Sequence, residues 1–398
     1  MTGKKYDPQD YFSGDLSPER SPKVFIAPHR YIQGENILDH LGRYIGVINS
    51  MNPAVLITKG GLKRIGNGVT QNLKKRGIEP AVLIFGGECS EGEISRHVNA
   101  LKGLSIDSVI AIGGGKCLDA GKCIAHRMSV PAVICPTVAS TDAPCSALSA
   151  IYKPDGSFDY AWHYAESPSI ILVDTAVIAK SPPRHLVAGM GDAIATYYEA
   201  RTCFLNPKAR TSIGARPTVA AYTIAETGAK LILENGVEAL DAVNRSVINE
   251  ALERVIEANT LLSGIGFESG GLAASHGVAM VLPVIPRLHT KYLHGEMVAV
   301  GVLIQNCLEG NIDEARRLTK FFAEVGLPAH LGQIDLDPEE YSEDIDLVIN
   351  AAMNIFFIHH EPFEVTPEKL RQAFKDAHEI GIRTVQDIGD EAYNRLHE

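Results

Sequence analysis

The sequence predicts a protein of two parts, a doubly wound parallel α/β domain over residues 23–180 and an all-α domain over 181–398. Short apolar runs alternate with helical patterns over roughly the first 175 residues, which is typical of parallel strands joined by crossover helices. Beyond Asp174-Thr175, long helical patterns follow one another and strand patterns nearly vanish. Ser181-Pro182-Pro183 interrupts both patterns and marks the expected boundary.

Six strands are expected in the first domain, because each is a short apolar run bounded by turn residues. They are Lys23–Ala27, Ala54–Thr58, Ala81–Phe85, Ser108–Ile112, Ala132–Cys135 and Ser169–Val173. Helical patterns fall between several of them, at Leu62–Arg76 and Glu91–Leu101. In the second domain the clearest helical patterns are Gly191–Cys203, Thr218–Glu234, Arg245–Leu262 and Glu368–His378.

The composition excludes several classes of protein. With 398 residues, 45% of them apolar and 21% charged, the chain can build large cores. A net charge of −11 argues against nucleic-acid or anionic-membrane partners. No apolar run is long enough to span a membrane, and residues 1–22 form a polar extension without the apolar core of a secretory signal. The seven cysteines are scattered and odd in number, which indicates reduced thiols in a cytoplasmic protein.

A glycine-rich turn follows the fourth predicted strand. Gly113-Gly114-Gly115-Lys116 opens a helix whose free N–H groups and positive partial charge suit a diphosphate. The spacing excludes a P-loop, and Leu118 stands where a dinucleotide fingerprint requires its third glycine. A turn without a ligand is the alternative, although three consecutive glycines give more freedom than a turn needs.

A second polar segment follows the fifth predicted strand. The sequence PTVASTDAPCSALSAIY (136–152) is dense in hydroxyls and contains one carboxylate, Asp142. Because ligands of such sheets bind at the carboxyl ends of the strands, this segment and the glycine-rich turn are expected to share one site. Together they indicate a nucleotide cradle beside a polar reaction chamber.

Three polar residues stand out in the apolar helical half. Asp192, His276 and His294 offer one carboxylate and two imidazoles, a set that can hold a divalent transition metal and leave one position open for a substrate oxygen. Each residue also has a simpler interpretation. Asp192 is suited to a helix N-cap, His276 to a hydrogen-bonded core and His294 to the surface.

These motifs together resemble the glycerol dehydrogenases of the metal-dependent, iron-containing type of alcohol dehydrogenase. The resemblance runs from His29 to about Pro367. It includes GGGKxxDxxK at 113–122, PTxASTDAPCSALSxIY at 136–152, AGMGDAxATYxEAR at 188–201 and HGE at 294–296. The fold that it implies is a nucleotide-binding α/β domain followed by a helical domain.

The resemblance also implies a reaction and a set of site residues. A divalent ion, zinc or alternatively iron, is expected at Asp192, His276 and His294, with Asp142 and His276 facing the polyol. The implied reaction is oxidation of glycerol or a similar vicinal diol to the hydroxyketone, with hydride transfer to NAD or NADP. The implied assembly is a cytoplasmic homo-oligomer, an octamer in many relatives. The cofactor contacts implied are Lys59, Gly114, Gly115, Lys116, Asp119, Thr137, Ser140, Ser146, Leu148 and Tyr152.

Three departures from the family pattern affect cofactor and substrate. Lys59 stands where the family has an acidic residue for the adenosine ribose, so NADP is expected to be accepted. The alternative is that Lys59 is simply solvated. Ala279 replaces a second histidine, and the chain between His276 and His294 is one residue longer, within 286–293. The alternative function is therefore an NADPH-dependent reductase of small 2-oxo acids on the same scaffold.

Other assignments fit the residues less well. A lyase resembling 3-dehydroquinate synthase, or a glycerol-1-phosphate dehydrogenase, needs several lysines and arginines around a phosphorylated substrate. The segment ASTDAPCSAL (139–148) is instead the version that polyol dehydrogenases carry. A catalytically weak binding protein is disfavoured because all three candidate metal ligands are present.

Overall fold

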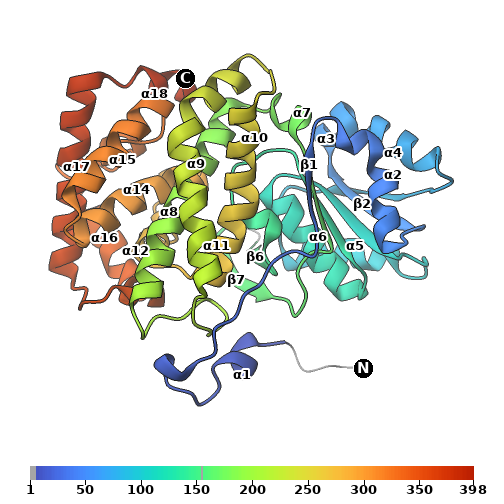
Figure 1. Ribbon diagram of the computed structural model, residues 1–398, viewed down its shortest axis with the longest axis horizontal. Coiled ribbons are helices and arrows are strands. Elements are labelled where there is room, and N and C mark those ends of the chain that lie inside the picture. The colour runs from blue at the N-terminus through green and yellow to red at the C-terminus, as the bar shows by residue number, and fades with distance from the viewer. Residues whose placement is uncertain (1–5, 154–155) are drawn as a thin grey trace. The chain divides into compact units, whose positions relative to one another are not determined.

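The computed structural model describes residues 6–153 and 156–398, and it divides into two compact units (Figure 1). The first contains Ile26–Ser181, and the second contains Pro182–Arg245 and Asn249–Glu398. Residues Gln9–Phe25, most of the described part of the polar extension, also belong to the second unit. Gln9 of this segment donates a hydrogen bond to the carbonyl oxygen of Ser212.

A parallel sheet forms the centre of the first unit (Figure 1). Its six strands lie in the order β1-β8-β5-β4-β2-β3. The predicted doubly wound α/β fold is thereby confirmed. A separate antiparallel pair, β6 and β7, lies beyond the sheet. The strands are β1 Tyr31–Gly34, β2 Pro53–Thr58, β3 Ala81–Phe85, β4 Ser108–Gly113, β5 Ala132–Pro136, β6 Leu148–Tyr152, β7 Phe158–His163 and β8 Ile170–Asp174.

The first predicted strand is wrong. Within Lys23–Ala27 only an isolated bridge forms, between Lys23 and Arg216, and the edge of the sheet is β1 instead. Prolines flank the run on both sides and cannot donate to a ladder, which disfavours a strand. The β6–β7 pair was not predicted, because β6 lies inside the hydroxyl-rich segment and breaks the apolar pattern of the other strands.

Both faces of the sheet are buried, as the unbroken apolar strands predict. Val55 and Ile57 of β2 point to a core shared with the helices that precede β2 and with α4. Ala54 and Leu56 point to the opposite core, under α5 and α6. The helices of this unit are α2 Leu41–Tyr44, α3 Lys59–Gly61, α4 Asn67–Lys74, α5 Glu91–Leu101, α6 Gly115–Met128 and α7 Thr175–Ile178.

The strand order identifies where a ligand binds. From β2 the chain passes to the edge strand β3 and then returns to β4 on the other side of β2. In open α/β sheets ligands bind at such a reversal, outside the carboxyl ends of the two strands. Lys59 directly follows β2 and Gly114 directly follows β4.

The second unit is built of helices around α8 and α14. Among the residues that the structure describes, no helix is long and apolar enough to cross a bilayer. The helices are α8 Pro183–Leu205, α9 Val219–Asn244, α10 Glu250–Glu257, α11 Ser263–Gly270, α12 Ala274–Ala279, α13 Pro286–Lys291, α14 His294–Leu308, α15 Ile312–Val325, α16 Ser342–Ala352, α17 Pro367–Ile388 and α18 Glu391–His397, with a π-helical turn at Ala258–Leu262 and α1 Pro8–Phe12 near the N-terminus.

A pair of buried carboxyl groups lies in this unit. Burial raises the pKa of Glu361 well above its usual range, and the neighbouring carboxylate of Glu309 raises it further. Glu309 itself accepts hydrogen bonds from Thr202 at 2.7 Å and Gln305 at 2.9 Å. Glu361 therefore keeps its proton at pH values at which an exposed glutamate is ionised.

We expect Glu361→Gln to change how stability depends on pH. The folded protein holds a proton on Glu361 that the unfolded chain releases above pH 4.5, so the free energy of unfolding falls as pH rises from 4.5 towards the raised pKa. Glutamine removes this loss, which amounts to at most about 1.4 kcal/mol per pH unit. Urea unfolding from pH 4.5 to 8 measures it, with the exposed Glu364→Gln as control. Parallel curves for the wild type and Glu361→Gln would contradict the assignment.

Candidate metal centre and dinucleotide-binding turn

Asp192, His276 and His294 come together in the second unit, although they lie on three different helices. One donor atom from each lies within 4.8 Å of the others. Nε2 of His276 is 3.4 Å and Nε2 of His294 is 3.7 Å from Oδ1 of Asp192. The N-cap interpretation of Asp192 is wrong, since this residue lies in the interior of α8. The simpler interpretations of the histidines describe their surroundings but do not explain this convergence.

Glu199 fixes the orientation of His276. Its Oε2 lies 2.5 Å from Nδ1 of His276, and its Oε1 accepts the backbone N–H groups of Ala273 and His276, both at 2.8 Å. With Nδ1 donating to the carboxylate, Nε2 is the nitrogen that faces Asp192. Histidine ligands of metals are commonly oriented in this way. Sequence reasoning missed Glu199; the available signal was its spacing of seven from Asp192, which places both on one face of α8.

Two close helix contacts set the spacing of the three candidate ligands. A Cβ atom on Gly191 would lie 2.5 Å from the carbonyl oxygen of Gly295, and one on Gly295 would overlap the carbonyl oxygen of Ala188. These glycines directly precede Asp192 and follow His294. In the same way, a Cβ atom on Gly301 would overlap the carbonyl oxygen of Ser275, the neighbour of His276. Glycine is therefore required for α8, α12 and α14 to approach as closely as they do.

The charges of the cluster favour a cation. Burial lowers the pKa of His276, but Glu199 and Asp192 outweigh it and raise this pKa well above the usual value. Desolvation lowers the pKa of His294, and Asp192 opposes this only in part. A bound ion replaces the proton between Asp192 and His276, so affinity for an ion should fall at low pH.

The donor set fits a divalent transition metal. One carboxylate oxygen and two imidazole nitrogens are ligands that suit zinc and iron. Three protein ligands also leave a coordination position open, as in catalytic sites. The side chain of His294 is 41% exposed, whereas that of Asp192 is fully buried. The cluster is thus more accessible from the side of His294 than from that of Asp192.

The glycine-rich turn lies at the reversal point of the sheet. Helix α6 begins at Gly115, with Gly114 as its N-cap in an extended conformation. Cβ atoms on Gly114 and Gly115 would meet their nearest neighbours at 3.7 and 3.6 Å, so no packing constraint explains these two glycines. By contrast, a Cβ on Gly121 would overlap Ala111 of β4. In the dinucleotide-binding fingerprint the third glycine, at the position of Leu118, allows close packing of helix and strand. In this chain Gly121 has that role instead.

Lys116, on the first turn of α6, is held by a carboxylate and an aromatic ring. Its Nζ lies 2.7 Å from Oε2 of Glu88 and 4.7 Å from the ring centre of Tyr152. Glu88 follows β3, and sequence reasoning assigned it no role. An anion that binds at the start of α6 has to share Lys116 with Glu88 or displace it.

The hydroxyl-rich segment is fixed from beneath by Lys122. Buried Nζ of Lys122 donates to Ser146 at 3.2 Å, to the carbonyl oxygen of Leu148 at 3.0 Å and to Asp119 at 3.3 Å. Asp119 also accepts the backbone N–H of Ala150 at 3.0 Å. The hydrogen bonds of Asp119 and Ser146 thus hold the segment in place, and contact of either with a cofactor stays a prediction.

The other predicted residues of this segment lie around the turn. The backbone N–H of Thr137 donates to the carbonyl oxygen of Gly113 at 2.9 Å, which joins the segment to the glycine-rich turn. Ser140 is partly exposed, and Asp142 is buried just before a short 3₁₀ turn at Ala143–Cys145. The structure therefore brings Gly114, Lys116, Thr137 and Tyr152 together in the first unit.

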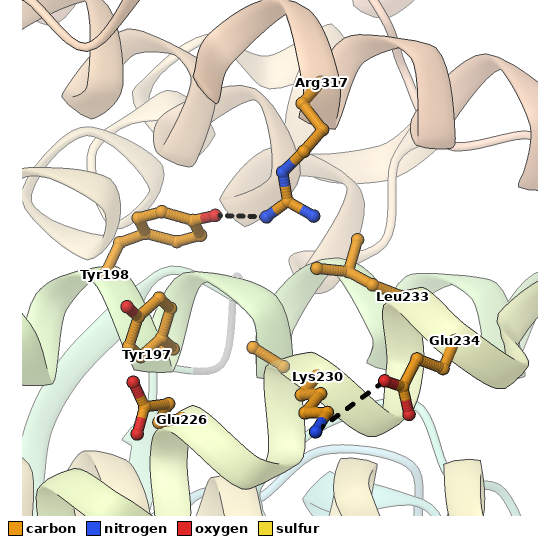
Figure 2. Close-up of a pocket in the computed structure, with 8 residues that line it drawn as sticks. Tyr197, Tyr198, Glu226, Lys230, Leu233, Glu234 and Arg317 are labelled. Carbon is orange, nitrogen blue, oxygen red and sulfur yellow. Dashed lines mark hydrogen bonds and ion pairs between the residues drawn. The ribbon is translucent and has the colours of Figure 1, made fainter. Parts of the chain in front are cut away.

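A surface pocket of about 260 Å³ lies elsewhere, between α8, α9 and α15 (Figure 2). Its cations pair with groups of the protein: Arg317 with Tyr198 at 3.3 Å and Glu314 at 2.6 Å, and Lys230 with Glu234 at 3.9 Å. None of the site residues predicted from the sequence lines it. The pocket therefore has no part in the site described above.

Comparison with known proteins agrees with this geometry. Residues 28–175 match the model of the iron-containing alcohol dehydrogenases. A glycerol dehydrogenase of Escherichia coli is 41% identical over 367 residues, which cover 92% of this chain and 99% of the relative. The chain belongs to the iron-containing alcohol dehydrogenase family. Members of this family use NAD(H) and a divalent metal, which agrees with the two sites.

Two further relatives carry the names of a reductase and of a dehydrogenase. A glycolaldehyde reductase of Halobacterium salinarum is 38% identical over 365 residues, covering 90% of this chain and 98% of the relative. The crystal structure of a glycerol dehydrogenase from Schizosaccharomyces pombe superposes with a TM-score of 0.87 at 32% identity, covering 92% of this chain and 93% of the other. The two-domain fold implied by the sequence is thus confirmed.

Proposed function

We propose that the protein oxidises glycerol or a similar vicinal diol to the hydroxyketone, with NAD(P)⁺ as hydride acceptor and zinc or iron at Asp192, His276 and His294. The observation that carries the proposal is that these three donors lie close together and that Glu199 orients one of them, His276. The identity of 41% with a glycerol dehydrogenase over nearly the whole chain supports the substrate.

In the proposed reaction one carbon loses a hydride to the cofactor, and its hydroxyl loses a proton that is released to solvent. The bound ion supplies Lewis acidity that favours the loss of this proton, and the nicotinamide accepts the hydride. Asp192, His276 and His294 would hold the ion, and Glu199 fixes the orientation of the His276 ring. Asp142, whose side chain is buried, is proposed to accept hydroxyl groups of the diol.

The chain binds the dinucleotide through the turn after β4. Backbone N–H groups at Gly114, Gly115 and Lys116 lie at the N-terminus of α6, where they can donate to a diphosphate. Lys116 adds a positive charge, shared with Glu88. Thr137, Ser140, Ser146, Leu148 and Tyr152 are proposed to line the adenine and nicotinamide regions.

Reduction of 2-oxo acids is less favoured, because a carboxylate substrate needs a cation that is not already paired. In the segment ahead of His294, Arg287 pairs with Asp344 at 2.5 Å and Lys291 with Asp335 at 2.7 Å. Arg184 pairs with buried Glu296. These cations are neutralised within the protein, which supports a neutral polyol.

A substrate panel tests the proposal. Zinc-loaded enzyme is assayed with glycerol, 1,2-propanediol and 1,3-propanediol, and in reverse with glycolaldehyde, 2-oxobutyrate and 2-oxoglutarate, with each cofactor. We expect vicinal diols to be preferred and Asp142→Ala to lose that preference, with the exposed Asp313→Asn unchanged. Activity with 2-oxo acids alone would contradict the proposal and support the alternative reductase.

We further propose that NADP is accepted, and that Lys59 is the reason. Lys59 follows β2 at the reversal point of the sheet, and Lys63 and Arg64 are on the next turn. Within the described residues, no carboxylate pairs with any of the three. The guanidinium of Arg64 lies 3.1 Å from the place that a Cβ on Gly60 would take, so it borders the same strand end. Cations at this position suit a 2′-phosphate, and an acidic residue would repel it.

Lys59→Asp is expected to lower kcat/KM with NADP about tenfold or more while sparing or raising that with NAD, since a repulsive charge replaces an attractive one. Steady-state kinetics with both cofactors measures the change, and Lys74→Asp on the following helix is the control. The proposal fails if the wild type strongly prefers NAD, or if the variant uses both cofactors equally.

Location and assembly are proposed as well. The seven cysteines are buried thiols that form no disulfide with one another, which supports a reducing, cytoplasmic environment. A homo-oligomer, an octamer by family resemblance, is proposed, without nucleic-acid or membrane partners. Light scattering of the purified protein measures the assembly, and a monomeric mass would overturn it.

A further inference from the structure

A buried carboxylate lies two residues after His294. Glu296 accepts hydrogen bonds from Nε and Nη2 of Arg184 at 2.6 and 2.7 Å and from the backbone N–H of Leu293 at 2.8 Å. Nε2 of His397 is 3.0 Å from the same carboxylate. The side chain of Glu296 is only 2% exposed, so its charge is balanced almost wholly by these neighbours.

The bond to Leu293 caps the helix that His294 begins. Leu293 is the N-cap of α14 and Glu296 its third residue, an arrangement that fixes where the helix starts. His294, the first residue of α14, is therefore placed by this cap. The cap alone requires only one of the four hydrogen bonds that Glu296 accepts.

The second partner connects this cap to another candidate ligand. Arg184 lies on the first turn of α8, the helix that carries Asp192. Its Nη2 also donates to the carbonyl oxygen of Lys291 at 2.9 Å, in the segment leading to His294. The ion pair of Arg184 and Glu296 thus joins α8 to the start of α14, beside the junction at which Asp192 and His294 meet.

The third partner comes from the last helix, 101 residues further along the chain. The ring of His397 stacks on Tyr393 of α18, with ring centres 3.8 Å apart and an interplanar angle of 18°. Tyr393 in turn donates a hydrogen bond to the carbonyl oxygen of Gln333. Helix α18 is therefore held in place by a contact that does not involve Glu296. Through His397, the position of α18 in turn restrains Glu296.

We propose that Arg184, Glu296 and His397 are positioning residues that hold His294 in its ligating place, so that docking of α18 governs how tightly the metal is retained. We call these three residues the clasp. The inference rests on the proposed metal centre. Movement of His294, the most exposed of the three ligands, would weaken metal binding, and the clasp reduces that movement.

Two variants test the clasp. His397→Phe keeps the stacking on Tyr393 and removes the hydrogen bond to Glu296. Glu296→Gln keeps an acceptor for the cap and removes the ion pair with Arg184. Arg371→Met is the matched control, because it breaks an ion pair with Asp346 on helices that carry no ligand.

Zinc affinity is measured by competition with a chelator, and the visible spectrum of the Co²⁺-substituted protein reports the ligand geometry. Thermal unfolding of the metal-free protein reports stability. We expect zinc binding to weaken about 10- to 100-fold in Glu296→Gln and by a smaller factor in His397→Phe, with an altered Co²⁺ spectrum, as for other residues that orient metal ligands. The control should lose stability alone.

The outcomes separate the two proposals. Unchanged zinc affinity and Co²⁺ spectrum in His397→Phe, which leaves the cap intact, would overturn the clasp while the metal centre stands. A wild type that binds no divalent ion would overturn the metal centre and the clasp with it. A variant that loses zinc affinity while the metal-free protein keeps the stability of the control would support the clasp, because a purely structural role would lower stability without selecting the metal.

Discussion

Asp192→Asn is expected to abolish metal retention and to lower kcat/KM by about a thousandfold or more, equivalent to roughly 4 kcal/mol of transition-state stabilisation. Asparagine has the same shape, so the packing of α8 is preserved. It removes the charge that faces both histidines, at 3.4 Å from His276 and 3.7 Å from His294. Metal content per chain and steady-state kinetics with glycerol measure the two effects.

Asp313→Asn serves as the control for this change. The side chain of Asp313 is fully exposed on α15 and pairs with Arg316 of the same helix, so its loss should leave metal content and rate unchanged. If Asp192→Asn retained one ion per chain with a rate within tenfold of the wild type, Asp192 would not be a ligand. The buried aspartate would then be a structural partner of His276.

Gly295→Ala is expected to damage the same site without removing any donor atom. The added Cβ overlaps the backbone carbonyl of Ala188, which cannot rotate away, so α8 and α14 must separate. Overpacking of this kind costs about 1–3 kcal/mol of stability. Because Asp192 and His294 lie beside this contact, a shift of about 1 Å should lower kcat about a hundredfold. Unfolding in urea and kinetics with saturating zinc measure the two effects.

Gly92→Ala is the matched control. Gly92 lies in α5 of the other unit, and a Cβ there would meet nothing within 4 Å. Alanine at an open helical position stabilises by about 1 kcal/mol or less. Gly295→Ala with normal stability and normal zinc affinity would show that the helices yield at no cost, and the role assigned to Gly295 would be wrong.

The pair of changes separates two contributions to the metal centre. Asp192→Asn removes a ligand and keeps the helix spacing, whereas Gly295→Ala keeps every ligand and alters the spacing. If ligand charge dominates, excess zinc cannot restore the first variant but restores the second in part. This comparison measures how much of the metal affinity depends on the close packing of α8 against α14.

The fold class could be predicted from local patterns alone, because the periodicity of apolar residues records which faces of a segment are buried. Strands β2, β3, β4 and β5 were predicted to within one residue at each end. The glycine-rich turn was located for the same reason, since a strand that ends in three glycines before a helix is a local pattern. The metal donors were visible as polar residues in apolar surroundings, although family resemblance was needed to connect them.

Tertiary structure alone decided how those residues are oriented. In the sequence, Glu199 is not distinguished from other glutamates in helical segments. Only the packing of α8 against α12 brings its carboxylate into contact with His276. Glu88 acquires a role only because β3 ends near the start of α6. His397 and Glu296 are 101 residues apart, and no periodicity connects them. Hydrogen bonds between distant segments depend on how helices dock, and local patterns of burial carry no record of that docking.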